Sequence, residues 1–255
     1  MCKYIDRAWR VAATGFSFAI FGLGGCLLGI LILVTLYPSP FDLSRKQRWT
    51  RQSISVACWI YVRIMRGLGL LSFSFANPEQ LKQPGQLVIA NHPTLLDVVF
   101  LLSQMPAANC IVKAELWRNP FTAGPVRLAG YLRNDAVLIE QAAAKINGGQ
   151  TLIIFPEGTR TRPGQAMKFK RGFANIAQLA KCKVTPVIID CSPPTLQKYQ
   201  KWYQIPERPP KFTFKVLAPI NVGERSDFNR PKTIQVRHLT RLFQTVLQGR
   251  PVPKH

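Results

Sequence analysis

Two short segments of the chain carry side chains that could act together in catalysis. The first is Asn91-His-Pro-Thr-Leu-Leu-Asp97, and the second is Phe155-Pro-Glu-Gly-Thr-Arg160. The first offers an imidazole as a base and a carboxylate that could orient it. The second offers a glycine-containing turn followed by an arginine, whose planar fork matches phosphate oxygens. Together they indicate that a hydroxyl of a phosphorylated molecule loses its proton and attacks a second group.

The spacing of the first segment decides whether its two side chains can meet. Residues five apart on a regular helix point about 140° away from each other. Pro93 suits the first turn of a helix and leaves His92 outside it in an extended conformation, so that His92 can fold back towards Asp97. Nδ1–H would then donate to the carboxylate and leave Nε2 as the base, as in the His–Asp part of a hydrolase triad. The alternative is structural: His92 caps a helix, and Asp97 occupies its first turn favourably.

The second segment also has a purely structural interpretation. Pro-Glu-Gly-Thr after a strand is ordinary turn chemistry, and the cations around it could form only a solvated basic face. These cations are Arg160, Arg162, Lys168, Lys170 and Arg171. We expect Glu157 to pair with one of them and fix the loop; a hydrogen bond from Glu157 to a substrate hydroxyl is the other option.

Alternating strand-like and helix-like runs position both segments. Short apolar runs predict strands buried on both faces at Leu87–Ala90, Cys110–Val112, Thr151–Phe155, Val184–Asp190 and Phe212–Ala218. Helical patterns cover Leu95–Gln104, a stretch near Phe121–Ala129, Ala136–Ile146, Gly172–Ala180 and Pro231–Leu247. The alternation predicts an α/β fold with a mostly parallel or mixed central sheet flanked by helices. In such sheets ligands bind beyond the carboxyl ends of strands, where both segments lie.

The first 75 residues have the composition of a two-helix membrane anchor. No charged residue occurs from Val11 to Phe41, and about 20 apolar residues are enough to cross the hydrocarbon core. A cleaved signal peptide is the alternative, but this apolar run exceeds the usual core of about 7–15 residues. Ser53–Phe73 is apolar with two arginines inside it, which favours an amphipathic helix at the headgroup level. We therefore expect an apolar helix at about 11–37, an amphipathic helix at about 50–73, and an α/β domain over 76–255.

The formal net charge of +22 calls for an anionic partner. Anionic lipid, nucleic acid and an acidic carrier protein all qualify. No zinc-finger, RRM or basic-zipper pattern is visible and the N-terminus favours a membrane, so we expect no nucleic acid. The six cysteines show no metal-binding spacing and there are only three histidines, which favours buried free thiols and no metal site.

The two segments resemble the first and third motifs of the glycerolipid acyltransferase family, whose bacterial type member is the lysophosphatidic acid acyltransferase. The resemblance covers about residues 85–190, and the two motifs in this order and spacing are highly specific. Val112–Pro120 resembles the segment before the family's second motif, and Val184–Ile189 resembles its fourth. Phe169–Gly172 resembles the basic segment that follows the third.

This resemblance implies a membrane-bound O-acyltransferase. His92 would deprotonate the free hydroxyl of a lysophospholipid, Asp97 would orient His92, and the hydroxyl would attack an acyl thioester. Neither a metal nor a cofactor is implied, beyond acyl-coenzyme A or acyl carrier protein as co-substrate. We expect the partners to be anionic membrane lipids and this donor, at the cytoplasmic face of the bacterial inner membrane. The expected substrate-binding residues are Glu157, Gly158, Thr159, Arg160, Arg133 and Lys113.

One segment departs from the family's pattern. The second motif normally ends in a glycine followed a few residues later by an arginine that contacts the acceptor phosphate, whereas here the region reads Gly130-Tyr-Leu-Arg-Asn-Asp135 and is shortened. Arg133 could supply the charge from a shifted position. This form resembles a subgroup that accompanies aryl-polyene pigment synthesis in Gram-negative bacteria.

The resemblance as a whole makes conversion of lysophosphatidic acid to phosphatidic acid the leading hypothesis. Acylation of a non-glycerolipid acceptor such as an aryl-polyene lipid is the second, and a non-catalytic membrane-tethered binding protein is the third.

Overall fold

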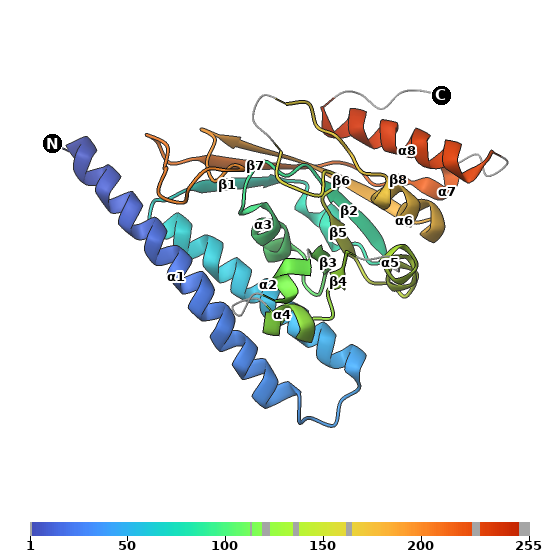
Figure 1. Cartoon of the computed structure of the whole chain (residues 1–255), viewed down its shortest axis with the longest axis horizontal. Helices are drawn as coiled ribbons and strands as arrows, with labels where there is room; N and C mark the ends of the chain where they lie inside the picture. Colours follow the sequence, from blue (N-terminus) through green and yellow to red (C-terminus); the bar gives the residue numbers. More distant parts are fainter. Residues whose placement is uncertain are drawn as a thin grey trace.

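A mixed sheet runs through the centre of the computed structural model, and helices cover both of its faces (Figure 1). The structure describes residues 2–112, 114–118, 123–134, 138–161, 165–225 and 230–249. The strands are β1 (Ser72–Ala76), β2 (Gln86–Ala90), β3 (Asn109–Val112), β4 (Leu132–Arg133), β5 (Leu152–Ile154), β6 (Lys183–Ser192), β7 (Lys211–Val216) and β8 (Ile220–Asn221). The α-helices are α1 (Cys2–Leu36), α2 (Leu43–Gly67), α3 (Asp97–Gln104), α4 (Ala123–Leu128), α5 (Leu138–Asn147), α6 (Gly172–Ala180), α7 (Val222–Arg225) and α8 (Lys232–Leu247), and the 3₁₀ helices are η1 (Pro78–Lys82) and η2 (Ala114–Trp117).

The sheet has the order β1-β7-β6-β2-β5-β3-β4, with β8 paired to β6. Most neighbours are parallel, and β6 is antiparallel to both β7 and β8. Strands β2 and β5 lie side by side in the same direction, with Ile89 opposite Ile154. The predicted α/β fold with a mixed central sheet is confirmed.

Strand β2 shows why the central strands read as continuously apolar. All five of its residues are buried. Val88 and Ala90 belong to a core cluster that includes side chains of α2 and α3, and Leu87 and Ile89 belong to a second cluster with α5, α6 and α8. Because helices cover both faces of the sheet, successive residues of the strand all meet apolar partners.

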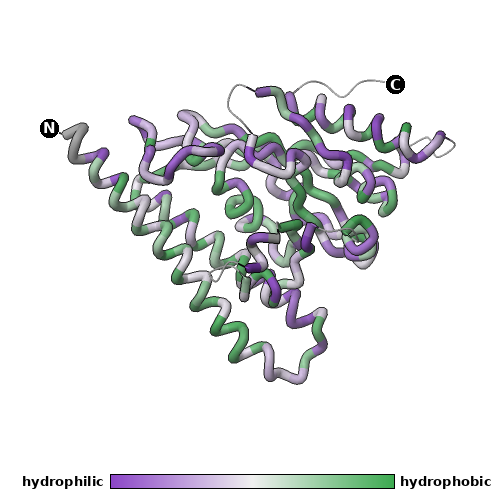
Figure 2. The backbone as a smooth tube through the Cα atoms, in the orientation of Figure 1, coloured by the Kyte–Doolittle hydropathy of each residue, from purple (hydrophilic) through white to green (hydrophobic). Residues whose placement is uncertain are grey.

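The chain begins with a long hairpin of α1 and α2 along one side of the α/β core (Figure 1). Asp6–Leu36 is long and apolar enough to cross a membrane (Figure 2), and only 11% of its apolar 18-residue window is buried against the rest of the chain. Helix α1 starts at Cys2, not at about residue 11 as predicted, because the polar N-terminal residues continue the helix. Arg10 is buried and pairs with Asp6 one turn earlier, at 2.9 Å between Nε and Oδ2.

Helix α2 differs from the predicted amphipathic helix at about 50–73. It spans Leu43–Gly67, and β1 begins five residues later as a parallel partner of β7. The prediction was wrong at this end because Ser72–Ala76 alternates exposed and half-buried residues, which is the pattern of a strand. Buried side chains of α2, such as Val62 and Met65, join the core cluster on one face of the sheet. Whether residues 1–75 act as a separate anchor stays a prediction.

The remaining elements agree closely with the sequence. All five predicted strands and the five helices predicted after residue 90 are present with ends within two residues of those expected. The two-residue strands β4 and β8 were missed because so short a run has no periodicity. Parts of two predicted helices, residues 121–122 and 136–137, lie outside the described residues.

Candidate active site

The two sequence segments meet at one end of the sheet. The first segment follows β2 and the second follows β5, and these strands are parallel neighbours. Their carboxyl ends therefore lie at the same edge, where open α/β sheets bind ligands. The backbone N–H of Thr161 donates to the carbonyl of His92 at 2.8 Å, so the two loops are also joined directly.

His92 and Asp97 form the predicted pair, with Nδ1 2.9 Å from Oδ2. Asp97 is fully buried, whereas the His92 side chain keeps 17% of its surface exposed. The His92 ring stacks on Phe155 with 4.2 Å between centroids, which fixes the plane of the imidazole. When Asp97 is ionised it can only accept, so Nδ1 carries the proton and Nε2 keeps its lone pair for a substrate.

The turn between the two residues differs from the expected one. Pro93 was predicted in the first turn of a helix, but α3 begins only at Asp97. Thr94 makes the turn instead: its backbone N–H donates to Oδ2 of Asp97 at 2.7 Å and its hydroxyl to Oδ1 at 2.6 Å. The bond from the Thr94 N–H to the carboxylate is one half of a capping box, whereas the Thr94 hydroxyl bonds the same carboxylate and accepts from the N–H of Leu96 at 3.2 Å. Asp97 is the first residue of α3, as the structural interpretation expects, but α3 has no side-chain cap, so the expected capping by His92 is not found.

Glu157 links the two loops. Its Oε1 accepts from the backbone N–H of His92 at 3.2 Å and from the hydroxyl of Thr161 at 2.8 Å. The side chain is buried, with 8% of its surface exposed. Among the described residues, which do not include Arg162, the partners of Glu157 are neutral donors and not the cation that the sequence predicts. The carboxylate therefore supports the backbone on which the imidazole is mounted.

Arg160 is anchored by its Nη1 atom, which donates to the carbonyls of Leu196 and Gln197 at 2.9 Å each. It lines an open cavity of about 520 Å³ beside the first loop. The other lining residues come from α1, the first loop and the loop after β6: Gly15, Phe18, Ala19, Leu95, Leu196, Gln200 and Trp202. The cavity is thus mostly apolar, with one cation at its edge. Such a lining suits an amphiphile.

The turn between Glu157 and Arg160 is cationic as well. Gly158 has a φ of +67°, a conformation that favours glycine. The side chain of Lys170 lies over this turn, so that a Cβ at Gly158 would come within 3.1 Å of its Cε. Thr159 is half-buried in the same turn. The geometry leaves the predicted substrate-binding role of Gly158 and Thr159 a prediction.

A further predicted residue, Arg133, lies on a different strand from the two loops. Arg133 is exposed on β4, the edge strand, with Val112 as its register partner on β3. It lies at the carboxyl end of its strand, and therefore at the same end of the sheet as His92, but β3 separates β4 from β5. Lys113 lies outside the described residues. The roles of both in acceptor binding stay predictions.

Sequence reasoning missed the residues that hold the first loop in place. The Asn91 side chain donates to the carbonyl of Ile189 and accepts from its backbone N–H, both at 2.7 Å, which fastens the loop to β6. Thr94 was detectable, because Thr-x-x-Asp is a capping-box signature. The Asn91 contact was not, since it depends on the pairing of β2 with β6.

A buried thiol lies close to the carboxylate of the pair. Burial raises the pKa of Cys191 to about 12, and the nearby charges of Asp97 and Asp190 act in the same direction. The thiol is therefore protonated at physiological pH. Among the described residues, no three His, Cys, Asp or Glu side chains gather as a metal-binding group.

The sequence is similar to those of known acyltransferases. The profile of a family described as "Acyltransferase" matches residues 72–190. A coconut (Cocos nucifera) protein named 1-acyl-sn-glycerol-3-phosphate acyltransferase is 26% identical over 197 residues, covering 69% of this chain and 63% of that protein. A Helicobacter pylori protein of the same name is 31% identical over 113 residues, covering 41% and 48%. The chain thus spans less than two thirds of the length of these relatives.

The fold has a close counterpart among solved structures. The crystal structure of the 1-acyl-sn-glycerophosphate (LPA) acyltransferase PlsC from Thermotoga maritima superposes with a TM-score of 0.71. The alignment covers 98% of this chain and all of that one, at 20% sequence identity. At this level of identity the likeness establishes the shared fold, including the helical hairpin before the sheet.

Proposed function

We propose that the chain, whose residues 72–190 match the profile of the acyltransferase family, transfers an acyl group from an acyl thioester to the free hydroxyl of 1-acylglycerol-3-phosphate. The product would be phosphatidic acid. The observation that carries the proposal is the 2.9 Å contact between His92 Nδ1 and a fully buried Asp97, beside an amphiphilic cavity. The names of the relatives support the choice of acceptor.

The chemical step follows from the orientation of the imidazole. Nε2 of His92 takes the proton of the acceptor hydroxyl while the hydroxyl oxygen bonds to the thioester carbonyl carbon. Asp97 stabilises the imidazolium that forms, as the carboxylate of a triad does. The tetrahedral intermediate then collapses, the C–S bond breaks, and the imidazolium returns its proton to the leaving sulfur. An ester and a free thiol result.

Acceptor binding is proposed in the cavity next to the first loop. Its apolar wall from α1 suits the acyl chain of a lysolipid, and Arg160 lies where the phosphate would be. Although Nη1 of Arg160 is bound to two carbonyls, Nη2 and Nε of the same fork can still donate to phosphate oxygens. Lys170 above the Gly158 turn adds positive charge nearby.

Membrane attachment is proposed through α1. One stripe of this helix presents exposed apolar side chains at positions spaced by three, four or seven residues: Trp9, Phe16, Leu23, Leu27, Ile30 and Val34. The opposite side of α1 contacts the rest of the molecule. Near its start Arg10 donates to the carbonyl of Pro206, and near its end Gly29 lies against Pro125 of α4. The proposed location is the cytoplasmic face of the bacterial inner membrane, where lysolipid and acyl thioester would both be available. Coenzyme A and acyl carrier protein are both proposed as carriers, because the net charge of +22 attracts either anion.

A different acceptor is the second candidate. The shortened segment from Gly130 to Arg133 favours it, since Arg133 lies on the edge strand and not beside the His92 loop. An acceptor without a phosphate, such as an aryl-polyene-type lipid, would not need that contact.

The test is product analysis with matched acceptors. Membranes carrying the parent chain or His92→Ala receive acyl-coenzyme A or acyl carrier protein thioester, together with either lysophosphatidic acid or the phosphate-free 1-acylglycerol. We expect phosphatidic acid by mass spectrometry from the parent only, with little product from 1-acylglycerol. Equal use of both acceptors would favour the second candidate, and equal activity of parent and variant would contradict the mechanism.

A further inference from the structure

The loop between β6 and β7 exposes an unusual group of side chains. Tyr199 is 77% exposed, and Trp202 and Tyr203 are 46% and 45% exposed. Two lysines lie over the tyrosine rings: Lys198 Nζ is 5.3 Å from the centroid of Tyr199, and Lys201 Nζ is 5.7 Å from that of Tyr203. We call residues 198–203 the aromatic loop. A group of large exposed aromatic side chains with lysines beside them is typical of an interaction surface.

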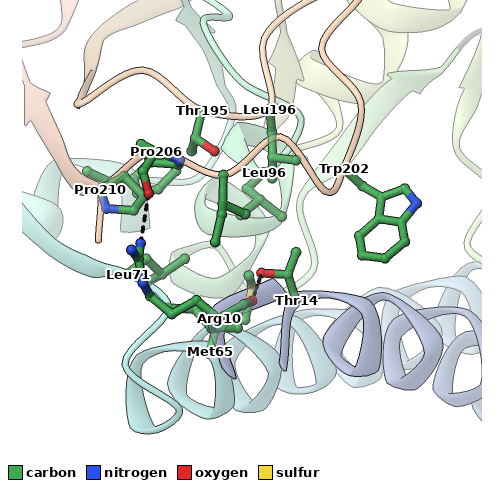
Figure 3. A pocket seen from close by; sticks show the side chains of 13 residues that line it. Arg10, Thr14, Met65, Leu71, Leu96, Thr195, Leu196, Trp202, Pro206 and Pro210 are labelled. Carbon is green, nitrogen blue, oxygen red and sulfur yellow. Dashed lines mark hydrogen bonds between the residues drawn. The ribbon is translucent and has the colours of Figure 1, made fainter. Parts of the chain in front are cut away.

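The aromatic loop is held in a defined position. Before it, Arg160 binds the carbonyls of residues 196 and 197. After it, Arg10 of the membrane helix donates from Nη1 to the carbonyl of Pro206 at 2.9 Å and from Nη2 to that of Glu207 at 2.6 Å (Figure 3). Trp202 lies above α1, so close to Gly15 that a Cβ there would come within 3.1 Å of the indole (Figure 3). The loop therefore keeps its place beside α1.

Its position continues the apolar stripe of α1. The residues of α1 that share the cavity with Trp202 are Gly15, Phe18 and Ala19. Ala19 is three positions from Phe16 of the exposed stripe, which places the two about 60° apart around the helix. A surface in contact with the stripe therefore passes close to the aromatic loop as well.

The basic residues around the aromatic loop indicate which kind of surface it would bind. Between residues 193 and 211 there are four basic residues, Lys198, Lys201, Arg208 and Lys211, and a single acidic one, Glu207. Tyrosine and tryptophan concentrate at the headgroup level of bilayers, and lysines near them are attracted to anionic lipids. A protein partner would more often bury a continuous apolar patch without interleaved lysines.

We propose that the aromatic loop is a second membrane contact, which docks on anionic phospholipid headgroups beside α1. Gln200 and Trp202 also line the cavity that Leu95 of the first loop and Arg160 border. Contact of both α1 and the loop with the bilayer directs the opening of that cavity towards the lipid. The contact itself does not depend on catalysis, so it can be tested separately from the proposed reaction.

The first experiment locates the loop with a fluorophore. The full chain carrying Tyr199→Cys is labelled with an environment-sensitive dye and reconstituted into vesicles of phosphatidylcholine with or without phosphatidylglycerol. Thr233→Cys on α8, at the far side of the sheet, is the control, because its side chain is also exposed. Signal from labelled native thiols is subtracted with the parent chain. We expect a blue shift and strong quenching by lipid-borne nitroxides at position 199 with phosphatidylglycerol present, and neither at 233.

The second experiment tests the charges. Lys198→Gln with Lys201→Gln removes two lysines from the loop, and Lys232→Gln with Arg237→Gln removes two exposed cations from α8. We expect the loop pair to reduce quenching at position 199 at least about threefold in phosphatidylglycerol vesicles, as 0.5 M salt should do for the parent. The α8 pair should leave it unchanged. Equal aqueous iodide quenching at 199 and 233, or equal signals with and without phosphatidylglycerol, would overturn the proposal.

Discussion

The loops after β2 and β5 are neighbours with equally distinctive sequences, yet their side chains are used differently. In the first loop, His92 and Asp97 point at each other and leave one ring nitrogen of the imidazole for a substrate. In the second, Glu157 and Arg160 are engaged with backbone groups: Glu157 with the N–H of His92, and Arg160 with two carbonyls beyond β6. One loop carries the proposed reacting group, and the other largely supports the backbone around it.

This difference shows that a motif identifies a site without assigning each residue a contact with substrate. A carboxylate near several arginines suggests an ion pair. In the structure, Glu157 instead accepts hydrogen bonds from the N–H of His92 and the hydroxyl of Thr161, which would otherwise lack this partner. The different contacts of the two loops predict different effects of substitutions. Substitutions in the first loop should lower kcat. Substitutions in the second loop should raise KM for the acceptor or lower the free energy of unfolding.

The largest effect is expected from His92→Ala. Removing a general base should lower kcat about 10³-fold or more, with little change in KM, because the acceptor cavity is lined by other residues. Initial rates of acyl transfer measure this, and His238→Ala on α8 is the control. A loss of less than about tenfold would show that the first loop does not carry the base.

Asp97→Asn should have the next largest effect, a decrease in kcat of about 10²- to 10³-fold. The amide has nearly the same size but no charge to stabilise the imidazolium, and its nitrogen cannot accept the hydrogen bond from Thr94. Circular dichroism should show an intact fold. A variant that changes KM and leaves kcat unaltered would place Asp97 in the frame and not in the chemistry.

Arg160→Lys should lower kcat/KM for lysophosphatidic acid about tenfold, because a single ammonium cannot hold two carbonyls and also grip a phosphate in a fork. Arg10→Lys is the matched control, since Arg10 donates to two carbonyls at the other end of the same loop. The comparison uses kcat/KM for lysophosphatidic acid and for 1-acylglycerol. Equal losses in both variants and with both acceptors would assign Arg160 to the frame alone.

Glu157→Gln should change kcat by no more than about threefold, because the amide oxygen can still accept from His92 N–H and from the Thr161 hydroxyl. Glu157→Ala removes both bonds and should lower the free energy of unfolding by about 2 kcal/mol. Activity assays and denaturant unfolding separate the two effects. A tenfold rise in KM for the glutamine variant would instead mean that the carboxylate binds a substrate hydroxyl.

The sequence predicted the first loop more completely than the second because its chemistry is local. Pro93 after a strand forces His92 out of any helix, and Asp97 lies within reach along the same loop. The partners of Arg160, in contrast, lie 36 and 37 residues away in an irregular loop, and no periodicity predicts where that loop folds. Asn91 depends in the same way on the pairing of β2 with β6.

The fold follows the same rule. Buried strands such as β2 and β5 were predictable because both of their faces are apolar. Strand β1 was mistaken for the end of a helix, since it continues an apolar run from α2 without a polar break, and only its pairing with β7 identifies it. Lone edge strands carry weaker patterns because one side has no partner to select their residues.

The smallest effect, essentially none, is expected from thiol reagents at Cys191, although its charge environment includes Asp97. Because burial raises the pKa of this thiol to about 12, almost none of it is ionised near neutral pH, and only the thiolate reacts with alkylating agents. Maleimide at pH 8 should therefore leave Cys191 unmodified and acyl transfer unchanged, as mass spectrometry of peptides and a rate assay would show. If Cys191 reacts first and activity falls with it, the thiol is ionised beside the carboxylate. The site would then contain a second reactive group, contributed by β6, that the sequence of the first loop does not reveal.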